Sequence, residues 1–382
     1  IVRRIDEVLN ECVQRQMVSD VPLGSLLSGG VDSSWVTAIA GRHLQGMDTF
    51  TVGFAEKDYD ETIYARSLAS TNGLEYHELK IGNRESADIL PRIIWFHDEP
   101  LTHANSLQIH MICRYAREYV KVLLTGEGAD ELFGGYPRYY ICKLGSIFLR
   151  QNYWVRKSIL HALDMVSERR ITKLRSSLGR IDKDLVLWNA EFMRWDRYAY
   201  LFERDEPDVS CRAQFLEKTW DPSLDALDNL LLFEQKTYLQ AILHRQDKMS
   251  MGASIESRVP LLDNMMVSLA GSIPARKKIN YFQLKRLFKK SAAENIPKKI
   301  VYKKKVGFGV PIGMWLMDRN GMGRYLDTLL ERAPSLYSIN KHRLCKIVEE
   351  HTSGTVDHED ILWPLINFTL WDQLFIVERT KV

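Results

Sequence analysis

A glycine-rich loop near the start of the chain carries residue types suited to binding phosphate. The apolar run Leu23–Leu27 leads directly into this loop, whose sequence is Ser28-Gly29-Gly30-Val31-Asp32-Ser33-Ser34. Glycine removes the side chains that would block a phosphate, and hydroxyls suit a helix start, where unpaired backbone amides point outward. The loop matches neither the Walker pattern nor the dinucleotide G-x-G-x-x-G pattern. It therefore predicts another kind of anion site, with a tight strand-to-helix turn as the simpler alternative.

An aspartate in this loop indicates a metal ion as well. Asp32 would repel a phosphate unless a divalent cation bridged the two groups. A second acidic loop, residues 125–136, follows the apolar run Val120–Leu124 and contains Asp130. In a parallel sheet both loops would leave the same edge, so the sequence predicts that Asp32 and Asp130 share a magnesium ion. The alternative is that the second loop is only a mobile surface turn.

Two further positions at this edge are candidates for contact with a substrate. Glu127 lies between two glycines of the second loop, where a pliant backbone would let its side chain reach a reacting group. In the run Thr49–Phe54, Gly53 would let a flat base lie against the backbone beside Val52. Taken alone, a buried strand with one glycine is the commoner explanation of that run.

The spacing of apolar residues predicts the elements that position these loops. Over residues 1–138, short apolar runs alternate with stretches of helical spacing, which is typical of crossover units that build a parallel sheet. From about residue 139 onward, the apolar residues fall in aromatic-rich amphipathic segments. We therefore predict an α/β fold. A parallel twisted sheet with flanking helices would occupy residues 1–138, and a mainly helical half would occupy residues 139–382.

Composition excludes several classes of protein. The 382 residues carry a formal net charge of +3, which is too small to favour binding to nucleic acid. No run approaches the ~20 consecutive apolar residues that a membrane span needs. The five cysteines are far apart and form no C-x-x-C pair, so we expect a reducing, cytoplasmic compartment. We expect small-molecule substrates and neither nucleic-acid nor membrane partners.

For three groups of charged or titratable residues, a structural or surface role competes with a functional one. Residues 276–305 contain twelve lysines or arginines, and we expect a solvated face for ten or more of them; Lys305 stands apart because a Gly-Phe-Gly turn follows it and would fix it at the cleft. In residues 245–263 we expect a buried ion-pair network, with surface charges as the alternative; its members would be Asp247, Glu256, Arg258 and Asp263. The spacing of His97, His103 and His110 matches no common metal site, so we expect structural or surface histidines.

Together these residues resemble a known family. The first loop is similar to the pyrophosphate loop of the N-type ATP pyrophosphatases, and the wider pattern resembles the synthetase domain of glutamine-dependent asparagine synthetases. The resemblance runs from residue 20 to about residue 316, through Asp20–Gly24, Asp60-Glu61 with Tyr64–Arg66, Asp98–Pro100, Gly126–Tyr136, Asp247–Met251, Glu256–Asp263 and Lys305–Pro311. The first loop is specific only for ATP pyrophosphatase chemistry, whereas the later blocks in this order are specific to the asparagine synthetase-like group.

The resemblance implies an adenine nucleotide alpha hydrolase-like fold and a ligase that forms a carbon-nitrogen bond. ATP would lie over the strand ends, with the nucleoside beside Leu27, Val52, Gly53, Thr125 and Gly126 and the phosphates on Ser28, Gly29, Gly30, Ser33 and Ser34. Asp32 and Asp130 match the family's magnesium ligands. Glu127 matches its catalytic glutamate, and Lys305 matches its lysine near the leaving pyrophosphate. Thr125 stands where the family commonly has Ser, a change that keeps the hydroxyl.

Three functions remain open at this point. The leading one converts ATP, aspartate and ammonia into asparagine, AMP and pyrophosphate through an acyl-adenylate, with the helical half closing the acceptor pocket and supplying Lys305. The second keeps the adenylation but amidates a sugar acid or closes a lactam ring. The third is a non-catalytic nucleotide-binding protein. Such a protein would be expected to have lost at least one of the four residues assigned to catalysis and metal binding. All four are present, namely Asp32, Glu127, Asp130 and Lys305.

Complete members of the family carry an amino-terminal glutaminase whose nucleophile is a terminal cysteine. This chain opens with Ile1-Val2-Arg3, so we expect that domain to be absent from it. Ammonia would come from solution, from a separate glutaminase subunit or from a domain removed from this chain. We favour removal, because Ile1 corresponds to the start of the family's second domain. The oligomeric state stays open, with a homodimer as one option.

Overall fold

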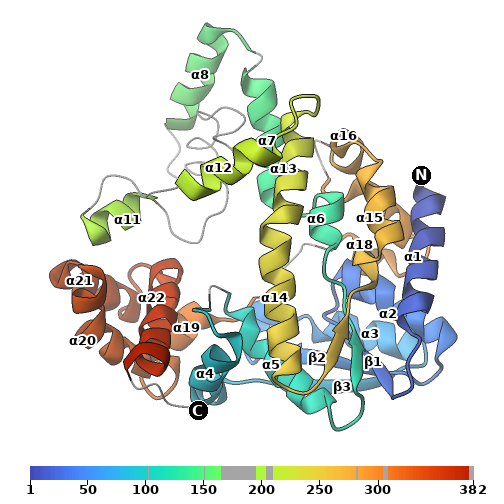
Figure 1. Cartoon of the computed structure of the whole chain (residues 1–382), viewed down its shortest axis with the longest axis horizontal. Coiled ribbons are helices and arrows are strands. Elements are labelled where there is room, and N and C mark those ends of the chain that lie inside the picture. Colours follow the sequence, from blue (N-terminus) through green and yellow to red (C-terminus); the bar gives the residue numbers. More distant parts are fainter. Residues whose placement is uncertain are drawn as a thin grey trace.

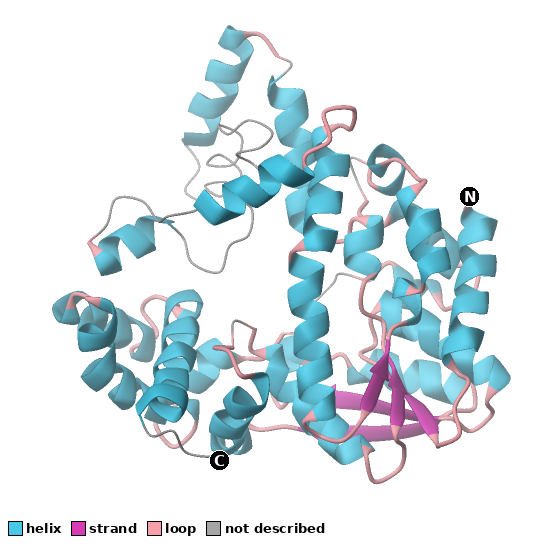
Figure 2. Ribbon diagram, in the orientation of Figure 1, coloured by secondary structure: helices cyan, strands magenta, loops and turns pink. Residues whose placement is uncertain are grey.

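The computed structural model describes residues 1–101, 103–149, 151–164, 195–203, 210–280, 283–303 and 309–377. A five-stranded parallel sheet lies between helices, and the second half of the chain is mainly helical (Figures 1 and 2). The predicted α/β fold with a parallel sheet and flanking helices is confirmed.

The first half alternates strands and helices, as its apolar spacing predicts. Its elements are α1 (Val2–Gln16), β1 (Leu23–Leu26), α2 (Val31–His43), β2 (Asp48–Gly53), the 3-10 helix η1 (Lys57–Tyr59), α3 (Thr62–Thr71), β3 (Glu75–Lys80), α4 (Asn83–His97), α5 (Asn105–Ala116), β4 (Val122–Leu124) and α6 (Ala129–Phe133). The apolar runs Leu23–Leu27, Thr49–Phe54 and Val120–Leu124 agree with β1, β2 and β4 to within two residues at each end.

The second half contributes helices and one short strand; labels follow Figure 1. Its elements are α7 (Pro137–Leu149), α8 (Tyr153–Asp164), α11 (Trp195–Phe202), α12 (Ser210–Thr219), α13 (Ala226–Lys236), α14 (Tyr238–Met251), β5 (Glu256–Arg258), η2 (Pro260–Leu262), α15 (Asn264–Gly271), α16 (Ala275–Lys278), α17 (Arg286–Ala292), α18 (Lys298–Val301), α19 (Ile312–Leu316), η3 (Met322–Arg324), α20 (Tyr325–Tyr337), α21 (Lys341–Thr352), α22 (Glu359–Asp372) and the π-helix η4 (Gln373–Val377). Within the described ranges, no helix is long and apolar enough to cross a membrane.

The strand order is β3-β2-β1-β4-β5, and every neighbouring pair is parallel. β5 corrects the expectation that the whole sheet lies within residues 1–138. Its three residues pair with β4, with Arg258 opposite Leu124, although they include no apolar side chain. Backbone pairing with an existing sheet edge therefore specifies this strand, and side-chain pattern does not.

Helices cover both faces of the sheet, as parallel strands require. Leu123 in β4 belongs to a core shared with α4, α5 and the carboxyl-terminal helices α19–α22. Its neighbours Val122 and Leu124 point to the opposite face and belong to a core shared with α1, α2, α3, α15 and α17. A smaller third core joins α7, α12, α13 and α16. Packing on both faces holds the carboxyl ends of the strands, and the loops that follow them, in fixed positions.

Candidate active site

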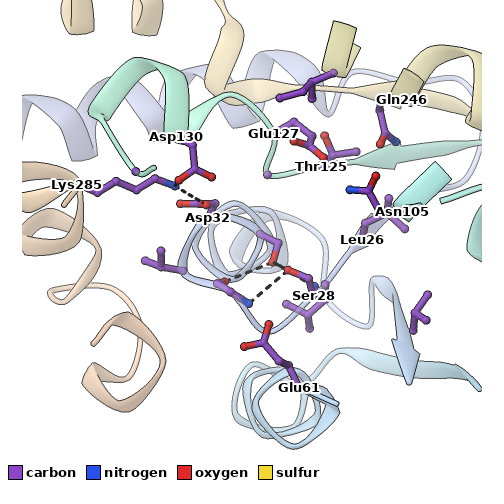
Figure 3. A pocket seen from close by; sticks show the side chains of 18 of the residues that line it. Leu26, Ser28, Asp32, Glu61, Asn105, Thr125, Glu127, Asp130, Gln246 and Lys285 are labelled. Atoms are coloured by element: carbon purple, nitrogen blue, oxygen red, sulfur yellow. Dashed lines mark hydrogen bonds and ion pairs between the residues drawn. The ribbon is translucent and has the colours of Figure 1, made fainter. Parts of the chain in front are cut away.

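A pocket of about 550 Å³ opens at the carboxyl ends of β1, β2 and β4. Residues of the two glycine loops form one part of its lining, and residues of β2, α5, α14, α17 and α18, with segments beside them, form much of the rest. Figure 3 shows side chains from these segments around one space, with Asp32 and Ser28 on the first loop and Thr125 and Glu127 on the second. Open α/β sheets place ligands at this edge.

The first loop turns sharply between β1 and α2. Gly29 has φ +75°, and a Cβ there would lie 2.8 Å from the Glu61 carbonyl oxygen, so only glycine fits. The Ser28 amide donates a hydrogen bond to Ser33 Oγ at 3.2 Å, and the two hydroxyl oxygens lie 2.9 Å apart. Ser28 and Ser33 both line the pocket. The loop therefore presents a pair of hydroxyls at a helix start.

The second loop packs directly on the first. A Cβ at Gly126 would lie 2.4 Å from the Ser33 nitrogen, so the two backbones approach as closely as glycine allows. Gly128 has φ +92°, and a Cβ there would lie 2.5 Å from Leu262 Cδ2. These contacts fix the loop in place and bring Glu127 and Asp130 to the pocket.

Asp32 and Asp130 converge on one lysine. Lys285 Nζ lies 2.6 Å from Asp32 Oδ2 and 2.8 Å from Asp130 Oδ1, and the lysine side chain is 4% exposed (Figure 3). Gly135 makes room for the pair, because a Cβ there would lie 1.7 Å from Asp130 Oδ1 and 2.3 Å from Lys285 Cε. The two carboxylates that were predicted to meet at the sheet edge lie together and share a positive charge.

Sequence reasoning missed Lys285 because it belongs to the basic block 276–305. That block is not simply a solvated face: Lys285 and Lys278 are both buried, and Lys303 lines the pocket. Burial lowers the pKa of Lys278 to about 8 in spite of the nearby Asp228 carboxylate. Lys305, the one residue of the block assigned to catalysis, lies outside the described residues.

Glu127 extends toward α14 and meets a buried arginine. Arg245 Nη2 lies 3.4 Å from Glu127 Oε1, and Arg245 Nη1 donates to Asn105 Oδ1 at 3.0 Å. The side chain of Arg245 is 6% exposed and that of Glu127 is 27% exposed. The guanidinium therefore holds the glutamate at the pocket and ties it to α5.

Arg245 is also the part of the charged run 245–263 that reaches the site. The other charges do not form the predicted buried network. Asp247 is exposed, Glu256 pairs with Arg258 at 2.7 Å with its own side chain 57% exposed, and Asp263 caps α15. The apolar residues interleaved with this run belong to the packing around it, and nothing in their spacing distinguishes Arg245 from its neighbours.

One wall of the pocket is aromatic, with arginine side chains close to it. His103, Tyr136 and Tyr238 line it, and the Arg138 guanidinium lies 4.2 Å from the centre of the Tyr136 ring and 4.5 Å from that of Tyr238. Burial, together with the positive charges of Arg245 and Arg138, lowers the pKa of His103 to about 3. The imidazole is therefore neutral at pH 7.

Near the first loop, an ion pair joins the two halves of the chain. Glu61 lies just before α3 and Lys303 just after α18, and their side chains form a salt bridge with Lys303 Nζ 4.3 Å from the centre of the Tyr64 ring. Both members of the pair line the pocket. The pair therefore lies beside the Ser28 end of the pocket, where Figure 3 places Glu61.

A buried carboxyl lies behind Asp130. Glu131 is 1% exposed, and the Tyr136 hydroxyl donates a hydrogen bond to Glu131 Oε1. Burial, with a contribution from the negative charge of Asp130, raises the pKa of Glu131 to about 7.

Most residues assigned to the site from the sequence line this pocket. Those that do are Leu27, Ser28, Gly30, Asp32, Ser33, Val52, Thr125, Gly126, Glu127 and Asp130. Three do not. Gly29 shapes the turn instead, Ser34 is fully buried, and a Cβ at Gly53 would lie 3.1 Å from Thr62 Cγ2, so α3 covers that glycine.

Two of the three histidines have structural surroundings. The His97 ring lies 3.2 Å from the Glu99 carbonyl oxygen through Nδ1, and the His110 ring lies 3.1 Å from the Met249 carbonyl oxygen through the same atom. Both residues are buried. Only His103 lines the pocket, so the three do not act together.

Several known proteins are similar to this chain in sequence. The family model described as asparagine synthase matches residues 4–373. Asparagine synthetase [glutamine-hydrolyzing] 1 of Bacillus subtilis is 30% identical over 384 residues, which cover 99% of this chain and 60% of that protein. A putative asparagine synthetase [glutamine-hydrolyzing] of Mycobacterium tuberculosis is 30% identical over 393 residues, which cover 97% of this chain and 57% of that protein.

Among solved structures, an NH3-dependent NAD synthetase from Campylobacter jejuni overlaps 63% of this chain and 96% of its own chain. With 15% sequence identity and a TM-score of 0.30, this overlap carries no argument about fold or function. The chain spans about 60% of the length of the Bacillus subtilis relative. From the match over residues 4–373 and the identity along nearly the whole chain, we conclude that this chain belongs to the asparagine synthase family.

Proposed function

We propose that the chain performs the ATP-dependent step of asparagine synthesis, converting aspartate, ATP and ammonia into asparagine, AMP and pyrophosphate through an acyl-adenylate. The observation that carries the proposal is the contact between the two glycine loops, which brings Asp32 and Asp130 onto one ammonium group inside a pocket. Membership of the asparagine synthase family supports the same reaction.

The pocket offers distinct surfaces to the parts of ATP. Leu27 and Val52 supply apolar lining for the base. Thr125 is 3% exposed, and its Oγ1 has no hydrogen-bond partner in the described part of the chain, so this hydroxyl is available to the nucleoside. We assign the phosphates to the paired hydroxyls of Ser28 and Ser33, because they lie at the start of α2.

Magnesium fits the acidic pair. The carboxylates of Asp32 and Asp130 already hold a positive charge between them, and carboxylate oxygens are ligands that Mg²⁺ prefers. No group of three His, Cys, Asp or Glu side chains within the described ranges could hold a metal ion, so phosphate oxygens and water would complete the coordination. Bound there, Mg²⁺ would neutralise negative charge on the departing pyrophosphate.

The first chemical step makes the acceptor reactive. A carboxylate does not react with ammonia in water, because its carbon is a poor electrophile and its oxygen is a poor leaving group. The side-chain carboxylate of aspartate attacks the α-phosphorus, and pyrophosphate departs. The protein contributes by positioning the two substrates and by stabilising charge on the leaving group. We assign stabilisation of the leaving pyrophosphate to Lys305, by its charge and by its match to the family's lysine near that group.

The second step is attack of ammonia on the acyl carbon, with AMP as the leaving group. Ammonia must lose a proton during this attack. We assign Glu127 to accept that proton or to orient the nucleophile, because it lines the pocket and Arg245 holds its carboxylate in place. Arg245 is therefore a positioning residue in this scheme.

We propose that a glutaminase domain or subunit supplies the ammonia. The relatives are named as glutamine-hydrolyzing, and the chain spans about 60% of one of them. All five cysteines are free, which favours a reducing, cytoplasmic compartment.

Pyrophosphate release with a panel of acids tests the proposal. The chain would be incubated with ATP, Mg²⁺, ammonium and one acid at a time, including aspartate, glutamate and sugar acids. We expect pyrophosphate and asparagine in proportion when aspartate is present. Turnover with another acid and none with aspartate would overturn the aspartate assignment and leave the adenylation in place. Absence of turnover with every acid, despite ATP binding, would favour the non-catalytic alternative.

A further inference from the structure

Lys285 has no role in the reaction as proposed, although it lies at the centre of the acidic pair. We propose that Lys285 is a built-in counter-ion: in the nucleotide-free protein its ammonium occupies the cation position that Asp32 and Asp130 share, and it withdraws from at least one of them when the metal and nucleotide bind. The inference rests on the proposed function for the identity of the incoming cation.

The contacts of the ammonium group support a shared position. Lys285 Nζ is 2.6 Å from Asp32 Oδ2 and 2.8 Å from Asp130 Oδ1, so a cation bound by these two oxygens would occupy the place of the nitrogen. The carboxylate side chains are only 20% and 16% exposed, so solvent screens them weakly. Without a cation between them, the two like charges would push the glycine loops apart.

The backbone of Lys285 is held in a conformation that lysine seldom adopts. Its φ is +51°, its amide donates to the Gly134 carbonyl oxygen at 3.2 Å, and α17 begins at the next residue. A side chain in this region of backbone space costs about 1–3 kcal/mol, and such strain collects at functional sites. Gly135 supplies the space that the ammonium and Asp130 occupy. The hydrogen bond to Gly134 and the space at Gly135 thus both accommodate Lys285.

A purely structural clamp between the two halves of the chain is the alternative. Buried ion pairs contribute little net stability compared with apolar groups of similar volume, so a clamp alone gives no reason for this charge. All three members of the cluster also line the pocket, where a ligand can reach them. A counter-ion role for Lys285 explains both the buried charge and its place in the pocket lining. This role predicts that free metal binds weakly, because the metal must displace the ammonium group.

Metal affinity in the absence of nucleotide separates these two explanations. Mn²⁺ binding to the whole chain would be measured by electron paramagnetic resonance, with Mn²⁺ as the probe for Mg²⁺. We expect Lys285→Met and Lys285→Gln to bind Mn²⁺ at least about tenfold more tightly than the unsubstituted chain, because each removes the competing charge. Lys285→Arg keeps the charge and should bind no more tightly than the unsubstituted chain. Lys289→Met, one turn further along α17 and also in the pocket, is the matched control and should change nothing.

Unchanged or weaker Mn²⁺ binding in both neutral variants would overturn the proposal, since a structural clamp predicts only lost stability. If these variants are unstable, thermal melting gives the same test: Mn²⁺ must raise the melting temperature of Lys285→Met more than that of the unsubstituted chain. Absence of that difference would also overturn it. Mn²⁺ binding needs no turnover, so a tighter site in a chain that adenylates no acid would refute the proposed function alone. Adenylation of aspartate with no gain in Mn²⁺ affinity would refute only the counter-ion.

Discussion

Gly126 and Ser33 touch through their backbones, and a Cβ on the glycine would lie 2.4 Å from the serine nitrogen. The contact joins the loop after β4 to the loop after β1, two strands that are hydrogen-bonded neighbours in the sheet. Because the loops cannot separate without breaking it, their carboxylates face the same pocket. The proposed chemistry depends on this closeness.

Gly126→Ala should therefore disrupt the site more than the rest of the fold. We expect the free energy of unfolding to fall by roughly 1–3 kcal/mol, as for other overpacked positions, and ATP binding to weaken beyond detection. Chemical denaturation and calorimetric titration with ATP would measure the two effects. Gly271→Ala is the control, because a Cβ there meets no atom within 4 Å. Full ATP affinity in Gly126→Ala would show that the loop contact is dispensable.

Glu127→Gln should slow product formation while sparing ATP binding. Loss of a group that accepts or directs a proton lowers turnover by roughly 10²–10⁴-fold. Asparagine formation and ATP affinity would be measured side by side, with the exposed Glu118→Gln as a surface control. Unchanged turnover would remove Glu127 from the mechanism.

Arg245→Met should act through Glu127. Its guanidinium lies 3.4 Å from the glutamate carboxylate, so its loss would remove a contact that positions that carboxylate and would lower kcat. Residues in contact show coupled effects, and we expect the double variant with Glu127→Gln to be no slower than Glu127→Gln alone by more than a few-fold. A double variant whose losses multiply would mean that the two side chains act independently.

Lys305→Met should slow the release of pyrophosphate, because the leaving group would lose a fixed positive charge. By analogy with other groups that stabilise developing charge, we expect a loss of roughly 10²–10³-fold in kcat. Lys304→Met gives a matched control one residue away. Equal effects of the two substitutions would point to a general loss of basic charge and would contradict a special role for Lys305.

Glu131 should make stability depend on pH. Its pKa in the folded protein is raised to about 7 from an ordinary value of 4.5, so folding favours the protonated form. The associated stability is fully present below about pH 4.5 and is lost as pH rises through 7. We expect Glu131→Gln to reduce the fall in unfolding free energy between pH 5 and pH 8 by up to roughly 3 kcal/mol, measured by denaturation at both values. An identical fall in the variant would show that Glu131 is not the group responsible.

Local sequence signals predicted the sheet and its loops well. Apolar runs at β1–β4 and the glycines that follow them are patterns within a dozen residues, so the neighbouring positions of Asp32 and Asp130 could be inferred without coordinates. Gly126 could be placed in a loop in the same way, although its contact with Ser33 could not.

Features formed by distant segments could not be predicted in this way. Lys285 lies 253 residues from Asp32 in the sequence, inside a basic block whose other members look alike. β5 has no apolar run and exists because its backbone pairs with β4. In the sequence, nothing except its place in a charged run distinguishes Arg245 from other arginines. In each case the deciding information is tertiary contact.

The fate of a carboxylate oxygen tests the proposed acyl-adenylate most directly. Aspartate labelled with ¹⁸O in its side-chain carboxylate would be supplied with ATP, Mg²⁺ and ammonium, and the nucleotide products would be analysed by mass spectrometry. Attack of that carboxylate on the α-phosphorus transfers one labelled oxygen to AMP, so we predict AMP that carries one ¹⁸O atom for each asparagine formed. Unlabelled AMP, or ADP as the product, would contradict the account.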